Sequence, residues 1–151
     1  CVYTTVVPYV FDSKQRLINV IILKVEAVNE FKKIDISANL AQSNKRVLHI
    51  LKKYENSLTE KVNQDLLESD SEKLLYQSIL KVTENNKIFL EAKNYKSLLN
   101  NLIHLSEPID NFFEDTMFNA DNKTIKHNRH LLLSDLNKAM NIIANLSVLG
   151  T

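Results

Sequence analysis

Hydrophobic residues recur every three or four positions along most of this chain. An α-helix turns once in about 3.6 residues, so this spacing is typical of helices that bury one face. Four stretches follow the pattern, and they are residues 14–31, about 38–54, 94–105 and about 123–146. In the first of them the expected core-facing stripe is Leu17, Val20, Ile21, Val28 and Phe31, interrupted by Lys24. The pattern predicts a protein built mainly from amphipathic helices.

Local signals predict two further helices. Ser69 stands three residues before Glu72, which is the spacing of a capping box at the start of a helix. We expect this helix to break or kink at Asn85 and Asn86. Pro108 is expected to open a short helix, because the first helical position tolerates proline. Together these elements predict an all-α fold, a helical bundle of about six helices.

The beginning of the chain allows two interpretations. Residues 2–11 are rich in β-branched and aromatic side chains, which favour a strand. A lone strand would have no partner elsewhere in the sequence, so we favour a helix. Asp12 or Ser13 is expected to cap the first long helix, and Asp35 or Ser37 the second.

Composition limits the kinds of site that the chain can hold. Of its 151 residues, 44% are hydrophobic and 25% are charged, which suits a single domain over residues 1–151. The single glycine, Gly150, excludes a glycine-rich phosphate loop, and the single cysteine, Cys1, excludes an internal disulfide. No apolar run approaches the roughly 20 residues that cross a bilayer, so no membrane contact is expected. Because the chain begins with cysteine instead of methionine, we expect it to be a fragment of a longer polypeptide.

Two basic clusters are the candidate binding surfaces. The formal net charge is only +1, so contact with nucleic acid would have to be made by a local patch. The candidate RNA-binding residues are Lys45, Arg46, Lys52, Lys53, Lys123, Lys126 and His127. Lysine and arginine contact phosphates, and arginine also stacks on bases. The alternatives are a merely solvated helix face, or an Asn44 and Arg46 that bond to the domain's own backbone.

Arg129 falls on the apolar stripe of the last helix, so it is expected to be half-buried and paired. The candidate partners are Asp110, Glu114 and Asp115. We therefore interpret Asn128 and Arg129 as structural residues. No nucleophile or base accompanies the three carboxylates, which predicts no catalytic role for them.

Two aromatic pairs have a functional and a structural interpretation. His127 and His130 are three residues apart and could face the same way, but a zinc site needs a third ligand, and we expect no metal. Phe112 and Phe113 could stack on bases. Adjacent aromatic residues on a short helix more commonly anchor it to a core, and we favour that role.

Two segments resemble a known family. Residues 40–53 carry Asn-Lys-Arg at 44–46 inside an apolar frame, and residues 107–133 carry Pro-Ile-Asp-Asn-Phe-Phe, a polar break and then Asn-Arg-His-Leu-Leu-Leu. These segments resemble the C-terminal, DALR-type anticodon-binding domain of bacterial glycyl-tRNA synthetase beta subunits. Three features depart from that pattern: Ser43 in place of alanine, His130 in place of leucine, and a reduced segment at 116–120. The fold expectation is unaffected by these departures.

The resemblance implies a domain that binds the anticodon arm of glycine tRNA and catalyses nothing itself. The parent enzyme would be an ATP-dependent aminoacyl-tRNA synthetase of the bacterial cytoplasm, with no cofactor held in this fragment. The implied partners are tRNA, the alpha subunit or region, and the rest of the beta subunit. The alternatives are a helical docking module that does not bind RNA, or the homologous domain of an arginyl-type synthetase.

Overall fold

The computed structural model describes residues 2–116 and 121–146, with side chains from Asp12 onward. Every regular element in these residues is helical, and none is a strand. The α-helices are α1 (Val2–Phe31), α2 (Asp35–Lys53), α3 (Asp70–Glu91), α4 (Tyr95–Asn101), α5 (Ser106–Asp115) and α6 (Lys123–Met140). Two 3₁₀ turns join them, η1 (Gln64–Leu66) and η2 (Leu102–Leu105). The expected all-α bundle of about six helices is confirmed.

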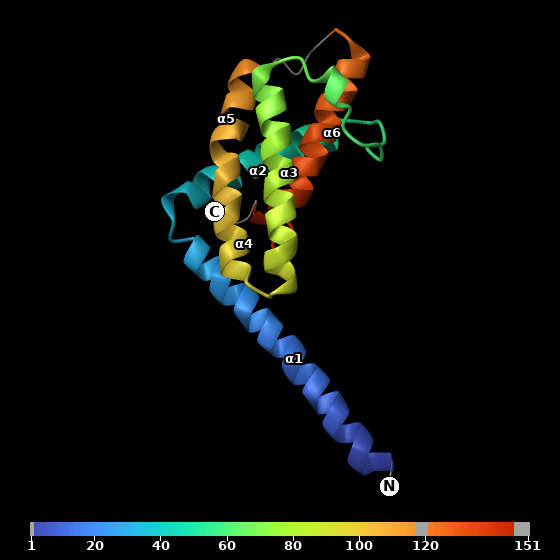
Figure 1. Ribbon diagram of the computed structural model, residues 1–151, viewed down its shortest axis with the longest axis vertical. Coiled ribbons are helices and arrows are strands. Elements are labelled where there is room, and N and C mark those ends of the chain that lie inside the picture. Colours follow the sequence, from blue (N-terminus) through green and yellow to red (C-terminus); the bar gives the residue numbers. More distant parts are fainter. Residues whose placement is uncertain (1, 117–120, 147–151) are drawn as a thin grey trace.

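The bundle is built around α3. In Figure 1, α4 and α5 form one column beside α3, α6 lies on its other side, and α2 crosses behind them. Helix α1 packs against α4 at one end, and the rest of α1 projects away from the bundle (Figure 1). The C-terminal half of α2 contacts α6. Residues of the two predicted basic clusters come together there.

Hydrophobic side chains from all six α-helices, most of them leucines, fill the core. Fully buried members come from every α-helix after α1, and α1 adds Ala27 and Phe31 at its C-terminal end. The largest fully buried side chains are Phe31, Phe112, Leu40, Leu75, Leu98, Leu99, Leu102, Leu105, Ile109, Leu132, Leu133 and Leu136. Packing of these stripes, rather than helix propensity alone, holds the short helices in place.

Helix α1 begins at Val2, so the helical interpretation of residues 2–11 is confirmed and the cap expected at Asp12 or Ser13 is wrong. Because the helix continues through Asp12 and Ser13, neither residue lies at a helix end, where a cap is needed. Asp12 instead pairs with Arg16 one turn later, at 2.7 Å. The expected apolar stripe is also only partly correct, since Leu17 is 61% exposed and Ile21 is 51% exposed.

Helix α2 starts earlier than expected, and neither Asp35 nor Ser37 caps it. Ile34 occupies the cap position without a side-chain hydrogen bond, and Asp35 lies in the first turn. There the carboxylate is near the positive end of the helix dipole, which is favourable. Ser37 lies inside the helix, and its hydroxyl donates back to the carbonyl of Lys32 at 3.4 Å.

The capping box of α3 is confirmed. The backbone N–H of Glu72 donates to the hydroxyl of Ser69 at 3.1 Å, and that hydroxyl donates to the Glu72 carboxylate at 3.3 Å. The break expected at Asn85–Asn86 is wrong, because α3 continues to Glu91. Asn86 is buried and accepts a hydrogen bond from Asn101 at 2.9 Å, so a contact between helices offsets its poor helix propensity.

The last helix is shorter than expected and ends at Met140, not at residue 146. The cause is the side chain of Asn141, which accepts a hydrogen bond from the backbone N–H of Leu146 at 3.1 Å. This bond folds the following residues back against the helix end. Pro108 is expected to open its helix, but α5 begins at Ser106, so that expectation is wrong and Pro108 lies two residues inside the first turn.

Candidate nucleic-acid interface

The second half of α2 presents cations to solvent. Lys45, Arg46, Lys52 and Lys53 are all exposed, and His49 lies among them. Leu40, Ala41 and Val47 are buried on the opposite side. Apart from Asp35 in its first turn, α2 contains no acidic residue. The nearly neutral net charge of the whole chain therefore conceals one strongly basic helix.

A shallow groove separates this half of α2 from the start of α6. It has a volume of about 410 Å³ and is lined by Arg46, His49, Ile50, Lys53, Tyr54, Lys126 and His130. The groove brings together cations from both predicted clusters, which are more than 70 residues apart in sequence. Three of the predicted cations do not line the groove: Lys45, Lys52 and Lys123. All three are exposed and lie one to three residues from a lining residue in the sequence.

Aromatic rings form one wall of the groove. The Tyr54 ring stacks on the His130 ring, with 3.7 Å between their centroids and 16° between their planes. The Nδ1–H of His130 donates to the carbonyl of Lys126 at 2.7 Å, since a carbonyl can only accept. Burial lowers the pKa of His130, against the raising effect of that hydrogen bond. The lowered pKa favours the uncharged form of the His130 ring in this stacked wall.

His127, a predicted RNA contact, is half-buried and partnered within the protein. Its Nδ1 lies 2.8 Å from the Tyr54 hydroxyl, and its Nε2 lies 3.3 Å from the Glu60 carboxylate. Because a carboxylate only accepts, Nε2 carries a proton, and in the neutral ring Nδ1 then accepts from Tyr54. The pKa of Glu60 is lowered, first by its backbone hydrogen bond and then by His127. His127 thus ties the loop after α2 to α6.

Arg46 lies at the boundary between the groove and a neighbouring hollow. Its guanidinium carbon is 4.0 Å from the centroid of the Phe113 ring, within the range of a cation–π contact. The neighbouring hollow, of about 340 Å³, is lined by Asn39, Gln42, Ser43, Arg46, Asp110, Phe113 and Glu114. Phe112 is fully buried, as expected, whereas Phe113 is only half-buried and supports the arginine.

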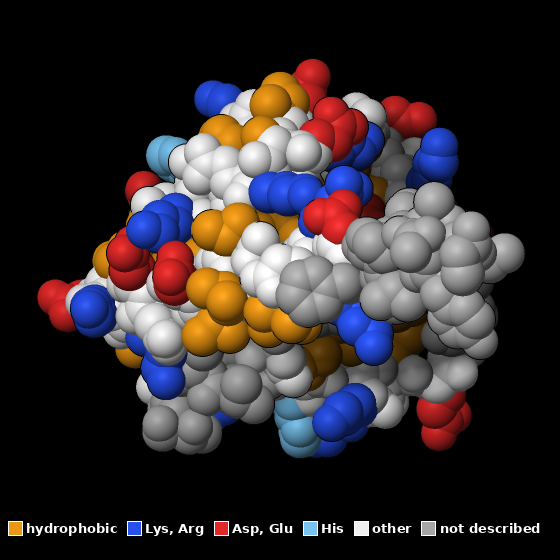
Figure 2. All heavy atoms as spheres, turned by 90° about the horizontal axis from the view of Figure 1, so that it is seen from below, with side chains coloured by type: hydrophobic (Ala, Val, Ile, Leu, Met, Phe, Trp, Pro, Cys, Tyr) orange, Lys and Arg blue, Asp and Glu red, His pale blue; other side chains and the backbone are white. Residues whose placement is uncertain are grey.

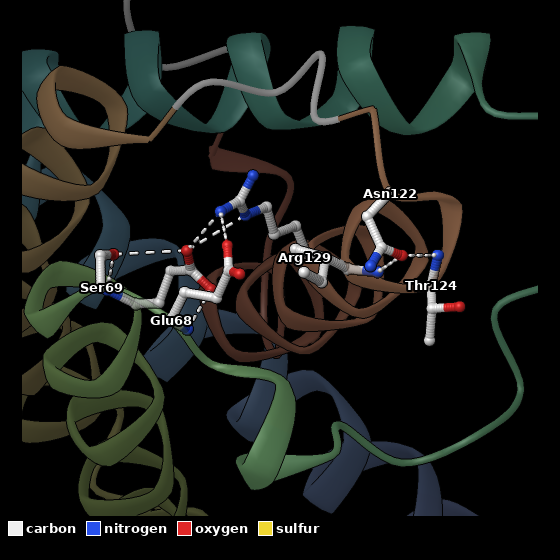
Figure 3. A network of polar contacts seen from close by, with 7 residues as sticks. Glu68, Ser69, Asn122, Thr124 and Arg129 are labelled. Carbon is white, nitrogen blue, oxygen red and sulfur yellow. Dashed lines mark hydrogen bonds and ion pairs between the residues drawn. The ribbon is translucent and has the colours of Figure 1, made fainter.

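Arg129 is structural, as predicted, but its expected partners are wrong. It is 7% exposed, and its Nη2 lies 2.8 Å from Glu72 and 3.2 Å from Glu68. Figure 3 shows the Arg129 side chain pointing toward Glu68. The start of α6 packs beside the start of α3, so the capping carboxylate of α3 is the one within reach. Two of the expected partners bond elsewhere: Asp110 accepts from Asn39 at 3.3 Å, and Asp115 accepts from the hydroxyl of Ser71.

Two asparagine side chains join distant segments. Asn128 accepts from the backbone N–H of Asn63 at 2.8 Å and donates to its carbonyl at 2.9 Å, which confirms a structural role. Asn44, although its neighbours Lys45 and Arg46 are exposed, is fully buried. It exchanges two hydrogen bonds with the side chain of Asn141, at 2.8 and 3.0 Å. Asn44 therefore bonds within the domain, to a side chain and not to backbone.

Sequence reasoning missed four residues of the groove: His49, Ile50, Tyr54 and His130. A usable signal was present, because residues 46, 49, 50 and 53 are spaced to share one side of a helix. In the described part of the chain, no group of three or more His, Cys, Asp or Glu side chains is placed to hold a metal ion. None of the described helices has the length and apolar character needed to span a membrane.

Comparison with known proteins identifies the family. The DALR anticodon binding domain matches residues 40–150, which include both the groove and the Phe112–Phe113 pair. The chain belongs to this family. The DALR-type fold expected from the Asn-Lys-Arg and Phe-Phe segments is thereby confirmed.

The curated relatives share one name, glycine–tRNA ligase beta subunit. The chain is 38% identical over 141 residues to the glycine–tRNA ligase beta subunit of Methylobacillus flagellatus, covering 93% of this chain and 20% of the relative. It is 37% identical over 126 residues to that of Vibrio parahaemolyticus, covering 83% and 18%. The Aliivibrio fischeri beta subunit is 36% identical over 126 residues. The chain spans about a fifth of the length of these relatives.

Proposed function

We propose that this DALR domain binds the anticodon arm of a glycine tRNA, as one part of a glycine–tRNA ligase beta subunit. The observation that carries the proposal is the groove between α2 and α6, where Arg46, Lys53 and Lys126 converge beside the stacked Tyr54 and His130 rings. The family match and the names of the relatives support the same conclusion.

Binding divides between charge and stacking. Arg46, Lys53 and Lys126 contact phosphates on both sides of the groove, while Lys45, Lys52 and Lys123 extend the positive surface beyond its rims. Unstacked anticodon bases lie against the aromatic wall or against the Arg46 guanidinium, because single-stranded RNA is recognised chiefly by stacking and by contacts to base edges. Phe113 holds Arg46 in place and so lowers the entropy that the arginine loses on binding.

His127 acts indirectly in this scheme. Its bonds to Tyr54 and Glu60 fix the aromatic wall and the loop after α2, so it positions the site. A direct contact between His127 and RNA stays an untested prediction.

The remaining steps belong to the parent protein. We propose that ATP-dependent glycine activation and transfer occur in other parts of an alpha–beta assembly in the bacterial cytoplasm. This domain would itself bind no cofactor and contact no membrane. The support is the name shared by relatives about five times as long as this chain. That name also favours the glycyl type over the homologous domain of an arginyl-type synthetase.

The rival function is a docking module that does not bind RNA. A fluorescence anisotropy titration separates the two, using the 151-residue chain and a labelled glycine tRNA transcript at two salt concentrations. The same transcript with a changed anticodon is the RNA control. The test variant is Arg46→Glu with Lys53→Glu, and the matched control is Lys32→Glu with Lys33→Glu, two exposed lysines beyond the opposite end of α2.

We expect salt-sensitive binding that weakens at least tenfold in the groove variant, less than twofold in the control variant, and measurably with the changed anticodon. Equal weakening by both variants would mean that tRNA binds by general electrostatic attraction and not at the groove. No binding by the native chain at low salt would favour the docking module.

A further inference from the structure

Helix α1 carries exposed apolar side chains in the part that extends beyond the bundle. Near its C-terminal end, α1 packs on the bundle through Ala27, Val28 and Phe31. At about 100° per residue, one mainly polar arc contains Asp12, Gln15, Arg16, Asn19, Glu26 and Glu30, with Leu23 among them. The other exposed apolar side chains, which we call the outer face of α1, are Leu17, Ile18, Ile21, Ile22 and Val25. Leu17 and Ile21 continue the stripe of Val28 toward the N-terminus, and Lys14 lies on the same side as the outer face.

The outer face is a concentrated patch, not scattered surface residues. Among the side chains that the structure describes, eleven large hydrophobic ones are exposed, and six of these lie in residues 17–25. The outer-face residues follow the i, i+3, i+4, i+7 spacing of a helix that buries one side. Figure 1 shows this part of α1 projecting beyond the bundle, and Figure 2 shows hydrophobic side chains exposed on that end of the molecule. A contiguous exposed apolar face of this kind marks an interaction surface.

The adjoining polar arc argues against a lipid surface as the partner. Helices that lie on membranes carry mostly lysine and arginine on their polar face. Here that arc contains Asp12, Glu26 and Glu30 against the single cation Arg16, which is itself paired with Asp12. Two lysines border or lie on the outer face, Lys14 and Lys24, and Lys24 is engaged over the Tyr95 ring. Charge on this arc therefore favours a protein partner.

The comparisons indicate which protein. The family match begins at residue 40, so α1 lies outside the DALR region. The match to the Methylobacillus flagellatus beta subunit covers 93% of this chain, so it includes most of α1, yet it occupies only 20% of that relative. We propose that the outer face of α1 docks against an apolar surface elsewhere in the same, longer polypeptide, and so fixes the orientation of the RNA-binding groove relative to the rest of the subunit.

Hydrogen exchange in the full-length subunit and in the 151-residue chain tests this proposal. We expect backbone amides of residues 14–25 to exchange at least tenfold more slowly in the full-length protein. The test variant, Ile18→Glu with Ile22→Glu, should abolish that difference. The control, Gln15→Glu with Asn19→Glu, places two glutamates at the same spacing on the polar arc and should preserve the difference.

Two results would overturn the proposal. Equal exchange rates in the two native proteins would mean that α1 is uncovered in the full-length subunit. Concentration-dependent protection in the 151-residue chain, with a dimer in sedimentation that Ile18→Glu and Ile22→Glu disperse, would identify a second copy as the occupant. Neither result depends on RNA binding. Both glutamate pairs should leave tRNA affinity of the short chain within twofold, so failure here is distinguishable from failure of the proposed function.

Discussion

Arg129 and Glu72, 57 positions apart, form a buried ion pair with the Arg129 Nη2 atom 2.8 Å from Glu72 Oε1. Glu72 is fully buried and also belongs to the capping box of α3. One carboxylate therefore completes a local helix start and joins α3 to α6. The positive charge of Arg129 is therefore neutralised inside the fold, and the proposed RNA-binding surface consists of other cations.

Removing this arginine should damage the fold more than the groove. Arg129→Ala leaves Glu72 buried without its main counter-charge, which costs about 3–5 kcal/mol of unfolding free energy. Urea denaturation followed by circular dichroism measures the loss. The affinity for tRNA, corrected for the folded fraction, should change less than threefold. A variant with native stability and weakened binding would show that Arg129 contacts RNA.

The role of Arg46 can be divided into charge and stacking. Arg46→Lys keeps the positive charge but loses the planar group that lies over Phe113. We expect weaker tRNA binding with an unchanged dependence of log Kd on log salt. Arg46→Ala should weaken binding further and reduce that slope by about 0.7–0.9. Identical behaviour of the lysine variant and the native protein would limit Arg46 to phosphate contact.

The hydrogen-bonded pair of the buried Asn44 and the half-buried Asn141 should be sensitive to removal of the Asn44 amide. Asn44→Ala removes two hydrogen bonds, which costs about 1–3 kcal/mol, while Asn141 keeps its bonds to Asn137 and to the backbone N–H of Leu146. The midpoint of urea unfolding should fall with an unchanged slope. Ser43→Ala is the control on the neighbouring position, and a comparable loss there would indicate a general effect on α2.

His130 should make stability depend on pH. Burial lowers the pKa of His130 in the folded state below its ordinary value of 6.5. The unfolded chain therefore binds the proton more tightly, so the stabilisation is complete above about pH 6.5 and is lost as pH falls through the lower, folded-state pKa. Thermal melts between pH 8 and pH 5 should show this loss.

His130→Phe keeps a ring against Tyr54 and removes the titrating group. The drop in melting temperature on acidification should be smaller in this variant than in the native protein. An identical drop would assign the pH dependence to other groups.

The sequence by itself determined the helical class, the capping box at Ser69 and the basic character of the second helix, because each is a property of neighbouring residues. It also carried the resemblance that the DALR match confirmed. Tertiary structure decided what depends on packing. Asn86 lies inside a helix and accepts from Asn101, Asn44 turns inward because Asn141 is there, and Arg129 pairs with Glu72 because α6 starts beside α3. The groove exists only where α2 meets α6, so no local pattern could have placed Arg46 and Lys126 together.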